Sequence, residues 1–536
     1  MNLNTRAATG KNMPSKSITK RDTTAEKTAA FFDFDGTVIA GYSAFYLLKE
    51  QIKRKLLGRH QITDVILGLV NYRAKLIDAD ELMSIGSSHL KGTLESDFSE
   101  LARQVYEKNI FKLIYPEARA LIEKHRQQGH QIVIVSSASH YQLADAAKEL
   151  GIEHILCTQY QVENGSFTGE VISPVCWGHG KVRAAHRFAA EHNIDLAQSY
   201  FYSDSDEDLP LLKAVGHPKP LNPNKRLSKI AKSNNWPSQT FNSRSRGISK
   251  TLRSVGVYTS LISAYFGGLG VSKLSGSSIT GRNFMVSSFS DFVCALIQME
   301  LKVRNPENMA NCGPAVVIFN HQSQADGFII MKLLRDNFAG IGKKEFGKFR
   351  LLANAYEFAG IIPIDRSDSK STINLMKPLV DTLQIEGRSV AIAPEGTRSS
   401  SMKPGPFKKG AFHLAIDAGV PILPVVIHNT ADVQAKGDFL FHPATVTVEI
   451  LPAINTSEWR KESLNEHIRE VRNQFLDALG FPTENAVGTK PATQKIVAAN
   501  DMPAAKPKPR AKKAAPKSSS AKASNSTTSQ TDKQSQ

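Results

Sequence analysis

The sequence predicts two successive α/β domains, and both its length and its pattern of apolar residues lead to this prediction. At 536 residues, the chain exceeds what a single hydrophobic core usually supports. Short apolar runs of β type alternate with helical patterns in residues 29–221 and again in residues 314–479. This alternation is typical of α/β folds.

The ends of the chain carry much of its net charge of +17. Residues 490–536 contain ten Lys or Arg and two Asp, a net charge of +8. Their Ala, Lys, Pro and Ser composition buries too little apolar surface to fold. We expect residues 1–27 and 481–536 to be disordered and basic. The tail either keeps the protein soluble or is attracted to an anionic membrane surface, and nucleic acid is the less favoured partner.

The cysteines and the N-terminus favour the cytosol. Cys157, Cys176, Cys294 and Cys312 lie far apart with no Cys-x-x-Cys spacing. This argues against a zinc site or a disulfide framework and fits a reducing compartment. The first residues lack the apolar core of a signal peptide. We expect a cytoplasmic protein that is peripheral to the inner face of the cell membrane.

The segment between the two domains contains the most apolar stretch, residues 255–271, which Thr, Ser and Gly interrupt. No stretch is expected to provide the ~20 apolar residues that cross a bilayer. We interpret residues 223–284 as a linker with amphipathic helices that lie on a membrane. Ordinary core helices of the second domain are an equally good interpretation.

Two carboxylates follow the first predicted strand. Asp33 and Asp35, in the run Asp-Phe-Asp-Gly-Thr, point to the same side because side chains alternate along an extended chain. One can attack phosphorus and form an aspartyl phosphate, while the other protonates the leaving oxygen and later activates water. Because carboxylates repel a phosphate dianion, the site needs a cation, and Mg2+ with oxygen ligands is expected.

Further polar residues complete this first site. Ser136 directly follows the apolar strand 131–135, and Asp204 follows a third predicted strand, so both lie where open α/β sheets bind ligands. Ser136 can donate a hydrogen bond to phosphate, with Ser137 and Ser139 as alternatives. Lys181 can hold a phosphoryl group as a point charge, and a last carboxylate follows Asp204 at Asp208.

This ordered set resembles the haloacid dehalogenase superfamily. The resemblance covers residues 28–222 and implies a Rossmann-like domain, in which the helical segment 42–115 is a cap similar to that of phosphoserine phosphatases. It implies that Asp33 is the nucleophile and Asp35 the general acid/base, and that the cap selects the substrate. The other implied roles are phosphate binding by Ser136 and Lys181 and metal binding by Asp33, Asp35, Asp204 and Asp208.

A second pair of catalytic residues follows the apolar strand 315–319. On a regular helix, His321 and Asp326 would point about 140° apart, so they can meet only where a loop turns into a helix. There the imidazole can take a proton from an alcohol while the carboxylate fixes its tautomer. The alcohol would attack a thioester directly, without a serine nucleophile, although Ser323 is a candidate to test.

Two later blocks each place an arginine just beyond an apolar strand. Arg366 and Arg398 can bind a phosphate by bidentate hydrogen bonds. Within the second block, Gly396 allows close approach of the backbone and Thr397 adds a hydroxyl donor. Lys408 either helps to bind phosphate or faces solvent.

The Asn-His-x-x-x-x-Asp and Pro-Glu-Gly-Thr-Arg-Ser blocks resemble the glycerolipid acyltransferase family, typified by 1-acylglycerol-3-phosphate acyltransferases. The resemblance covers residues 285–480 and implies an α/β domain with His321 and Asp326 as the catalytic dyad. One departure is Ala393, where the family often has an aromatic residue. The residues that the resemblance places around the glycerol phosphate are Arg366, Glu395, Gly396, Thr397 and Arg398.

These patterns predict a bifunctional enzyme. One domain would transfer an acyl group from acyl-CoA or acyl carrier protein to lysophosphatidic acid, giving phosphatidic acid. The other would hydrolyse a phosphomonoester with Mg2+, either a lipid of the same pathway or phosphoserine. One alternative is an acyltransferase with an inactive regulatory phosphatase domain. A second is a phosphoserine phosphatase that is fused to the acyltransferase but does not share a pathway with it. A third is a membrane or nucleic-acid binding protein that acts through its basic ends.

Overall fold

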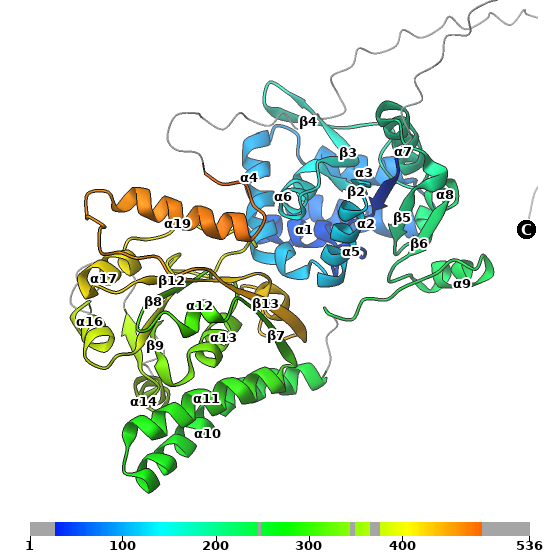
Figure 1. The fold of residues 1–536 in the computed structure, drawn as a ribbon. Coiled ribbons are helices and arrows are strands. Elements are labelled where there is room, and N and C mark those ends of the chain that lie inside the picture. Colours follow the sequence, from blue (N-terminus) through cyan, green and yellow to red (C-terminus); the bar gives the residue numbers. More distant parts are fainter. Residues whose placement is uncertain (1–26, 245–247, 344–348, 365–375, 485–536) are drawn as a thin grey trace, which may run out of the picture. The chain divides into compact units, whose positions relative to one another are not determined.

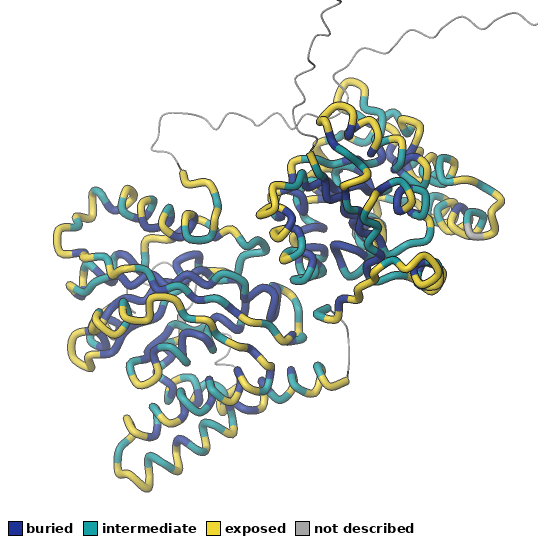
Figure 2. Tube along the Cα trace, turned by 45° about the vertical axis from the view of Figure 1, so that its right-hand side comes forward, coloured by how far each residue is buried: buried dark blue, intermediate teal, exposed yellow. Residues whose placement is uncertain are grey.

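The computed structural model describes residues 27–244, 248–343, 349–364 and 376–484, which form two α/β domains, each with its own sheet (Figure 1). The central strands are among the most buried parts of both domains (Figure 2). The ends that the sequence predicts to be disordered lie outside the described residues, apart from a few residues next to the domains. The predicted α/β class is confirmed.

The sheet of the N-terminal domain has six strands in the order β4-β3-β2-β1-β5-β6. Neighbouring strands are parallel, except for the antiparallel pair β3 and β4. Because β1 lies between β2 and β5, the carboxyl ends of these three strands meet at one edge. The strands are β1 (Ala29–Phe32), β2 (Gln131–Ser139), β3 (His154–Glu163), β4 (Ser166–Ile172), β5 (Tyr200–Ser203) and β6 (His217–Pro220).

Helices cover both faces of this sheet. Successive strand residues point to opposite faces, so Phe32 packs with α5 and α6, whereas Phe31 packs with α7 and α8. Gly151, with a φ of 63°, ends α6 in the left-handed conformation that favours glycine. The helices are α5 (Pro116–Gln127), α6 (His140–Leu150), α7 (His179–His192), α8 (Leu209–Ala214) and α9 (Lys225–Ser233).

Four α-helices between β1 and α5 form most of the helical insertion that the sequence predicts in residues 42–115. The third of them begins with a capping box, in which Glu81 N donates to the Asp78 carboxylate at 2.9 Å and Asp78 N donates to the Glu81 carboxylate at 3.3 Å. Helix α2 packs on α3, which packs on β4. The helices are α1 (Ser43–Lys53), α2 (Arg59–Arg73), α3 (Ala79–Ser88) and α4 (Glu95–Val105).

One strand of this domain is longer than the sequence predicts. The apolar run 131–135 suggests that Ser136 follows the strand, but β2 continues to Ser139. Its pairing with β3 shifts in register between these two serines. The apolar run marks only part of the strand, because the extended and largely buried backbone continues through the polar residues Ser136 and Ser139.

The sheet of the C-terminal domain has seven strands in the order β10-β9-β11-β8-β12-β13-β7. Strand β8 pairs in parallel with β11 and β12, and β13 is antiparallel to β12. The Val-Val-Ile-Phe sequence of β8 is entirely buried, as suits β-branched and aromatic side chains. The strands are β7 (Met299–Arg304), β8 (Val316–Phe319), β9 (Phe338–Lys343), β10 (Ile361–Ile364), β11 (Ser389–Ile392), β12 (Ile422–Ile427) and β13 (Ala444–Ile450).

Helices also cover both faces of the second sheet. The first group, with α10, α11, α13 and α14, packs on the face that carries Val317, and the second group, with α16, α17 and α19, packs on the face that carries Ile318. The helices are α10 (Ile248–Ser275), α11 (Ser278–Leu296), α12 (Glu307–Ala310), α13 (Ala325–Leu334), α14 (Arg350–Phe358), α16 (Met376–Gln384), α17 (Gly410–Ala418), α18 (Thr430–Val433) and α19 (Leu464–Ala478).

Much of the segment interpreted as a linker forms a helical hairpin of α10 and α11 (Figure 1). The two helices touch where a Cβ on Gly281 would lie 2.3 Å from the Gly268 carbonyl oxygen. Buried residues of both helices, such as Val257 and Phe289, belong to the core beside the sheet. The hairpin is therefore part of the C-terminal domain.

Among the described residues, α10 is the one helix that is long and apolar enough to cross a membrane, judged by length and composition alone. This corrects the expectation that no segment reaches that length. Only 28% of its most apolar 18-residue window is buried. Large apolar side chains such as Leu252 and Phe266 are exposed on this helix.

Candidate active sites

The strand order brings several of the predicted residues of the N-terminal domain to one edge of its sheet. Asp33 follows β1, and Asp204 follows β5, its parallel neighbour. Ser136 lies on β2, on the other side of β1, and its hydroxyl accepts a hydrogen bond from Ala138 N at 3.2 Å. The alternative Ser139 is engaged in the N-terminal cap of α6. The role of Ser136 in binding phosphate stays a prediction.

Lys181, on α7, is buried between two carboxylates. Its Nζ lies 3.0 Å from Asp33 Oδ1 and 2.8 Å from Asp208 Oδ2. Burial disfavours the charged amine, but Asp208 and Asp33 outweigh burial and raise the pKa of Lys181. Ser203 Oγ also donates to Asp208 Oδ2 at 2.7 Å. Asp208 therefore holds the lysine in a charged state, directed at Asp33.

Asp35 is oriented by a residue that sequence reasoning missed. Ser43, at the start of α1, donates its backbone N–H to Asp35 Oδ1 at 2.8 Å and its hydroxyl to Oδ2 at 3.0 Å. Burial nevertheless raises the pKa of Asp35 to about 6. A carboxyl group with such a pKa can both give and take a proton near neutral pH. The only available signal was a hydroxyl residue at a helix start.

The turn after Asp35 requires a glycine for two reasons. Gly36 has a φ of 76°, and a Cβ at this position would lie 2.3 Å from Asp204 Oδ2. The absence of a side chain thus lets the Asp204 carboxylate approach the backbone that follows the first two acids. Burial raises the pKa of Asp204 to about 7, and the charge of Asp208 adds to this shift.

The arrangement of these acids fits a cation with few protein ligands. Within the described parts of the chain, no three His, Cys, Asp or Glu side chains are grouped as a ready metal site. Asp35 accepts hydrogen bonds from Ser43, and Asp208 accepts them from Lys181 and Ser203. Metal binding by the four acids stays a prediction. Asp33 and Asp204 are the two that fit, because Mg2+ commonly uses one or two carboxylates together with water and substrate phosphate.

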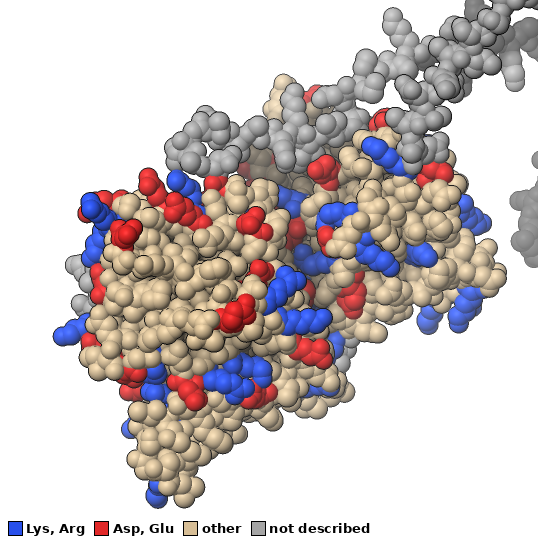
Figure 3. Space-filling view, viewed as in Figure 1, with Lys and Arg blue, Asp and Glu red and all other residues tan. Residues whose placement is uncertain are grey.

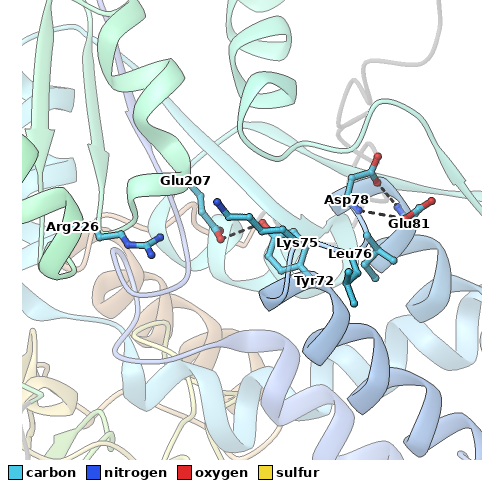
Figure 4. A pocket seen from close by; sticks show the side chains of 8 residues that line it. Tyr72, Lys75, Leu76, Asp78, Glu81, Glu207 and Arg226 are labelled. Carbon is cyan, nitrogen blue, oxygen red and sulfur yellow. Dashed lines mark hydrogen bonds between the residues drawn. The ribbon is translucent and has the colours of Figure 1, made fainter.

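A cavity of about 670 Å³ lies beside this cluster, between the inserted helices and the core of the domain. Tyr72, from α2, and Glu207, from the loop after β5, point toward one another in it, and Tyr72 Oη donates to Glu207 Oε1 at 3.1 Å (Figure 4). Lys75, Leu76 and Arg226 also line it. The volume of this cavity is large enough for a substrate bigger than phosphate itself.

In the C-terminal domain, His321 and Asp326 meet as the sequence predicts. His321 lies in the loop after β8, and Asp326 is the second residue of α13. The His321 Nδ1 to Asp326 Oδ2 distance is 2.8 Å. Since a carboxylate only accepts hydrogen bonds, Nδ1 carries the proton and Nε2 is free to act as a base.

Asp326 is completely buried and accepts several hydrogen bonds. Besides His321, the backbone N–H groups of Gln322 and Ser323 donate to Oδ2, each at 2.8 Å. Thr430, at the start of α18, donates its hydroxyl to Oδ1. Sequence reasoning missed Thr430, because 104 residues separate it from Asp326 and no motif marks it.

Glu395 and Asn320 fix the loop that carries the histidine. Glu395 accepts from His321 N at 2.7 Å and from Gly405 N at 2.8 Å. Asn320 exchanges two 2.7 Å hydrogen bonds with the backbone of Ile427, at the end of β12. Glu395, which the resemblance places around the substrate, has both carboxylate oxygens engaged by backbone donors in this structure.

The residues expected to bind phosphate are only partly described. Arg366 lies outside the described residues. Arg398 has a buried Nη1 atom that finds no hydrogen-bond partner within the described part of the chain. Gly396 has a φ of 72°, and a Cβ there would meet Lys408 Nζ at 2.8 Å, whereas Thr397 is exposed. A buried unpaired guanidinium donor suits an anionic ligand.

Comparisons with known proteins separate the two domains in the same way. Residues 30–213 match the haloacid dehalogenase-like hydrolase family, and residues 300–428 match the acyltransferase family. A probable phosphatase of Mycobacterium tuberculosis is 32% identical over 219 residues, which cover 40% of this chain and 76% of that protein. A 1-acyl-sn-glycerol-3-phosphate acyltransferase of Saccharomyces cerevisiae is 30% identical over 233 residues, or 42% of this chain and 77% of that protein. The chain belongs to both families.

The similarity of the acyltransferase domain extends to plants. A 1-acyl-sn-glycerol-3-phosphate acyltransferase of Limnanthes alba is 35% identical over 162 residues, which cover 30% of this chain and 58% of that protein. Both resemblances predicted from the motifs are thus confirmed, and the chain is an enzyme with a hydrolase domain and an acyltransferase domain.

We expect Gly36→Ala to slow hydrolysis of p-nitrophenyl phosphate about a hundredfold, since a displacement of about 1 Å in an active site can cost that much. The added Cβ would displace the Asp204 carboxylate. Gly165→Ala is the matched control, because Gly165 has the same φ of 76° but its Cβ would meet nothing within 4 Å. Equal rates in the two variants would contradict the close approach of Asp204 to Gly36.

Thr430→Val keeps the shape of the side chain but removes a hydrogen bond to buried Asp326. An unpaired buried acceptor costs about 1–3 kcal/mol, so we expect initial rates of acyl transfer to fall about tenfold. Thr456→Val is the control, because the buried Thr456 hydroxyl donates to the Val420 carbonyl and not to the dyad. A wild-type rate in Thr430→Val would show that the dyad does not need this bond.

Proposed function

We propose that the acyltransferase domain transfers a fatty acyl group from a thioester of coenzyme A or acyl carrier protein to 1-acylglycerol 3-phosphate, forming phosphatidic acid. The 2.8 Å contact between His321 Nδ1 and Asp326 Oδ2 carries this proposal. The yeast and Limnanthes relatives, which are 1-acyl-sn-glycerol-3-phosphate acyltransferases, support the choice of acceptor.

In this reaction His321 is the general base. Its Nε2 takes the proton of the acceptor hydroxyl while the oxygen attacks the thioester carbonyl carbon. The new ester C–O bond forms, the C–S bond breaks, and the proton passes to the leaving thiolate. Buried Asp326 stabilises the imidazolium that exists between these proton transfers. Ser323 is not needed as a nucleophile, because the acceptor hydroxyl attacks the thioester itself.

Arg398 binds the phosphate of the acceptor in this proposal. Its buried Nη1, which finds no hydrogen-bond partner among the described residues, offers a donor, and a guanidinium pairs with phosphate by charge-assisted hydrogen bonds. Arg366 is the predicted second arginine. Lys408, beside Gly396, adds a positive charge. These residues hold the acceptor so that its free hydroxyl meets the histidine.

The hydrolase domain, in turn, hydrolyses a phosphomonoester in two steps. Asp33 attacks phosphorus, the P–O ester bond breaks, and Asp35 gives its proton to the leaving alcohol oxygen. Water then attacks the aspartyl phosphate, Asp35 takes a proton from it, and phosphate leaves. Lys181 compensates the negative charge, and Asp33 and Asp204 would hold Mg2+, which would supply further charge compensation.

The enzyme is also proposed to work at the inner face of the cell membrane. At the end of the α10–α11 hairpin, at the bottom of the view in Figure 3, the surface shows few charged atoms. Exposed Leu252, Phe266 and Leu274 on α10, and Phe284 and Phe292 on α11, support contact with lipid. The basic ends of the chain would strengthen binding to an anionic surface.

Two substitutions should separate the activities. His321→Ala should lower phosphatidic acid formation about a thousandfold, as expected for loss of a general base, and leave p-nitrophenyl phosphate hydrolysis intact. Asp33→Asn should do the reverse, because a carboxamide is not a nucleophile. Ser323→Ala, the control, should keep most of the acyltransferase activity. Acylation that survives in His321→Ala would overturn the assignment of the base, and phosphate release by Asp33→Asn would overturn that of the nucleophile.

Removal of divalent cations should affect only the hydrolase domain. We expect EDTA to abolish release of phosphate from p-nitrophenyl phosphate and added Mg2+ to restore it, whereas acyl transfer in the same preparation stays constant. Asp204→Asn should raise the Mg2+ concentration needed for half-maximal activity, and Asp206→Asn, a neighbouring carboxylate outside the cluster, should not. Phosphate release that persists in EDTA would argue against a metal at this site.

A further inference from the structure

The outer surface of the inserted helices of the hydrolase domain is unusually apolar. On α2, Ile66, Leu67 and Val70 are each about half exposed. Their spacing of one, three and four residues puts them on one side of the helix. Gly68 lies on the opposite side, where a Cβ would meet Leu82 and Ile85 of α3. These apolar residues therefore point away from the helix that α2 packs on.

Helix α1 and the turn after it combine exposed apolar and basic residues. Phe45 and Ile52 are exposed, and Lys49 and Lys53 occupy the same side of the helix at spacings of four and eight residues from Phe45. Residues 42–77 contain seven Lys or Arg and two Asp or Glu, a net charge of +5. We define the cap face by its exposed members: Phe45, Lys49, Ile52, Lys53, Ile66, Leu67 and Val70.

The apolar surface borders the catalytic acids. Tyr42 is 64% exposed and precedes Ser43, which holds Asp35. Leu76, three residues after α2, is 73% exposed and lines the cavity beside the Asp204–Asp208 loop. A molecule with an apolar tail in contact with these residues could place its phosphate near Asp33.

We infer that the cap face docks on an anionic membrane and that the hydrolase domain takes a lipid phosphomonoester from it. This rests on the proposed phosphatase function of Asp33. Interleaved apolar and basic side chains are the pattern that binds such surfaces, since apolar groups enter the headgroup layer and lysine ammonium groups reach the lipid phosphates. Hydrolysis breaks the P–O ester bond of the lipid, and water supplies the atoms that yield a lipid alcohol and inorganic phosphate.

The test measures phosphate release from a membrane-bound and a soluble substrate by the same enzyme variants. Full-length protein, without an acyl donor, is given lysophosphatidic acid in phosphatidylglycerol vesicles or soluble p-nitrophenyl phosphate. We expect Leu67→Ser to lower phosphate release from the vesicles about tenfold, by loss of apolar burial, and to leave the soluble reaction unchanged. Ile172→Ser is the control, because Ile172 on β4 is also about half exposed but lies outside the cap face. It should change neither reaction.

A second pair of variants tests the charges. The wild-type enzyme should release phosphate faster from phosphatidylglycerol vesicles than from phosphatidylcholine vesicles that carry the same substrate. Lys49→Glu/Lys53→Glu should remove this difference in rate. Lys225→Glu/Lys229→Glu, with the same charge change at the same spacing on exposed α9 positions, should keep that preference.

The outcomes separate the two proposals. If wild-type enzyme hydrolyses p-nitrophenyl phosphate but Leu67→Ser leaves the vesicle reaction unchanged, docking by the cap face is wrong and the phosphatase function stands. If wild-type enzyme hydrolyses neither substrate, the phosphatase function itself is wrong. If Leu67→Ser instead turns an oligomer into a monomer in light scattering, the cap face binds a second copy of the chain, which also overturns docking on lipid.

Discussion

Charges that a fold buries must be paired, and both sites of this protein are arranged around such pairs. Lys181 is held between Asp33 and Asp208. Asp326 accepts hydrogen bonds from His321, two backbone N–H groups and Thr430. An ion without such partners would lose several kcal/mol of hydration free energy on burial. The pairs therefore fix the side chains that the chemistry needs before substrate binds.

The parallel sheets supply the geometry for these pairs. In each domain a central strand, β1 or β8, lies between two parallel neighbours, so polar residues after separate strands meet at one edge. Asp33 meets the acids after β5 in this way. His321 meets Glu395, which follows β11. Loops can vary at this edge without loss of the core, because the buried strands carry the packing.

Two amphipathic surfaces connect the sites with the substrates proposed for them. The α10–α11 hairpin packs on the core through one side and exposes apolar residues on the other. The cap face exposes apolar and basic residues next to the phosphatase acids. If both surfaces bind lipid, lysophosphatidic acid becomes a substrate that one domain acylates and the other dephosphorylates. The hydrolase domain would then determine how much acceptor reaches the acyltransferase domain.

The sequence by itself determined the two α/β domains and the residues that meet through short segments. His321 and Asp326 are five positions apart, so the turn from β8 into α13 was enough to predict their contact. The tertiary structure decided which residues support them. Thr430 reaches Asp326 only because the folded chain brings together segments that are far apart in the sequence, and Ser43 reaches Asp35 because of how the chain turns between β1 and α1. The sequence also predicted four acids as metal ligands, and only the folded chain shows which donors hold two of them, Asp35 and Asp208, since buried polar groups take hydrogen-bond partners.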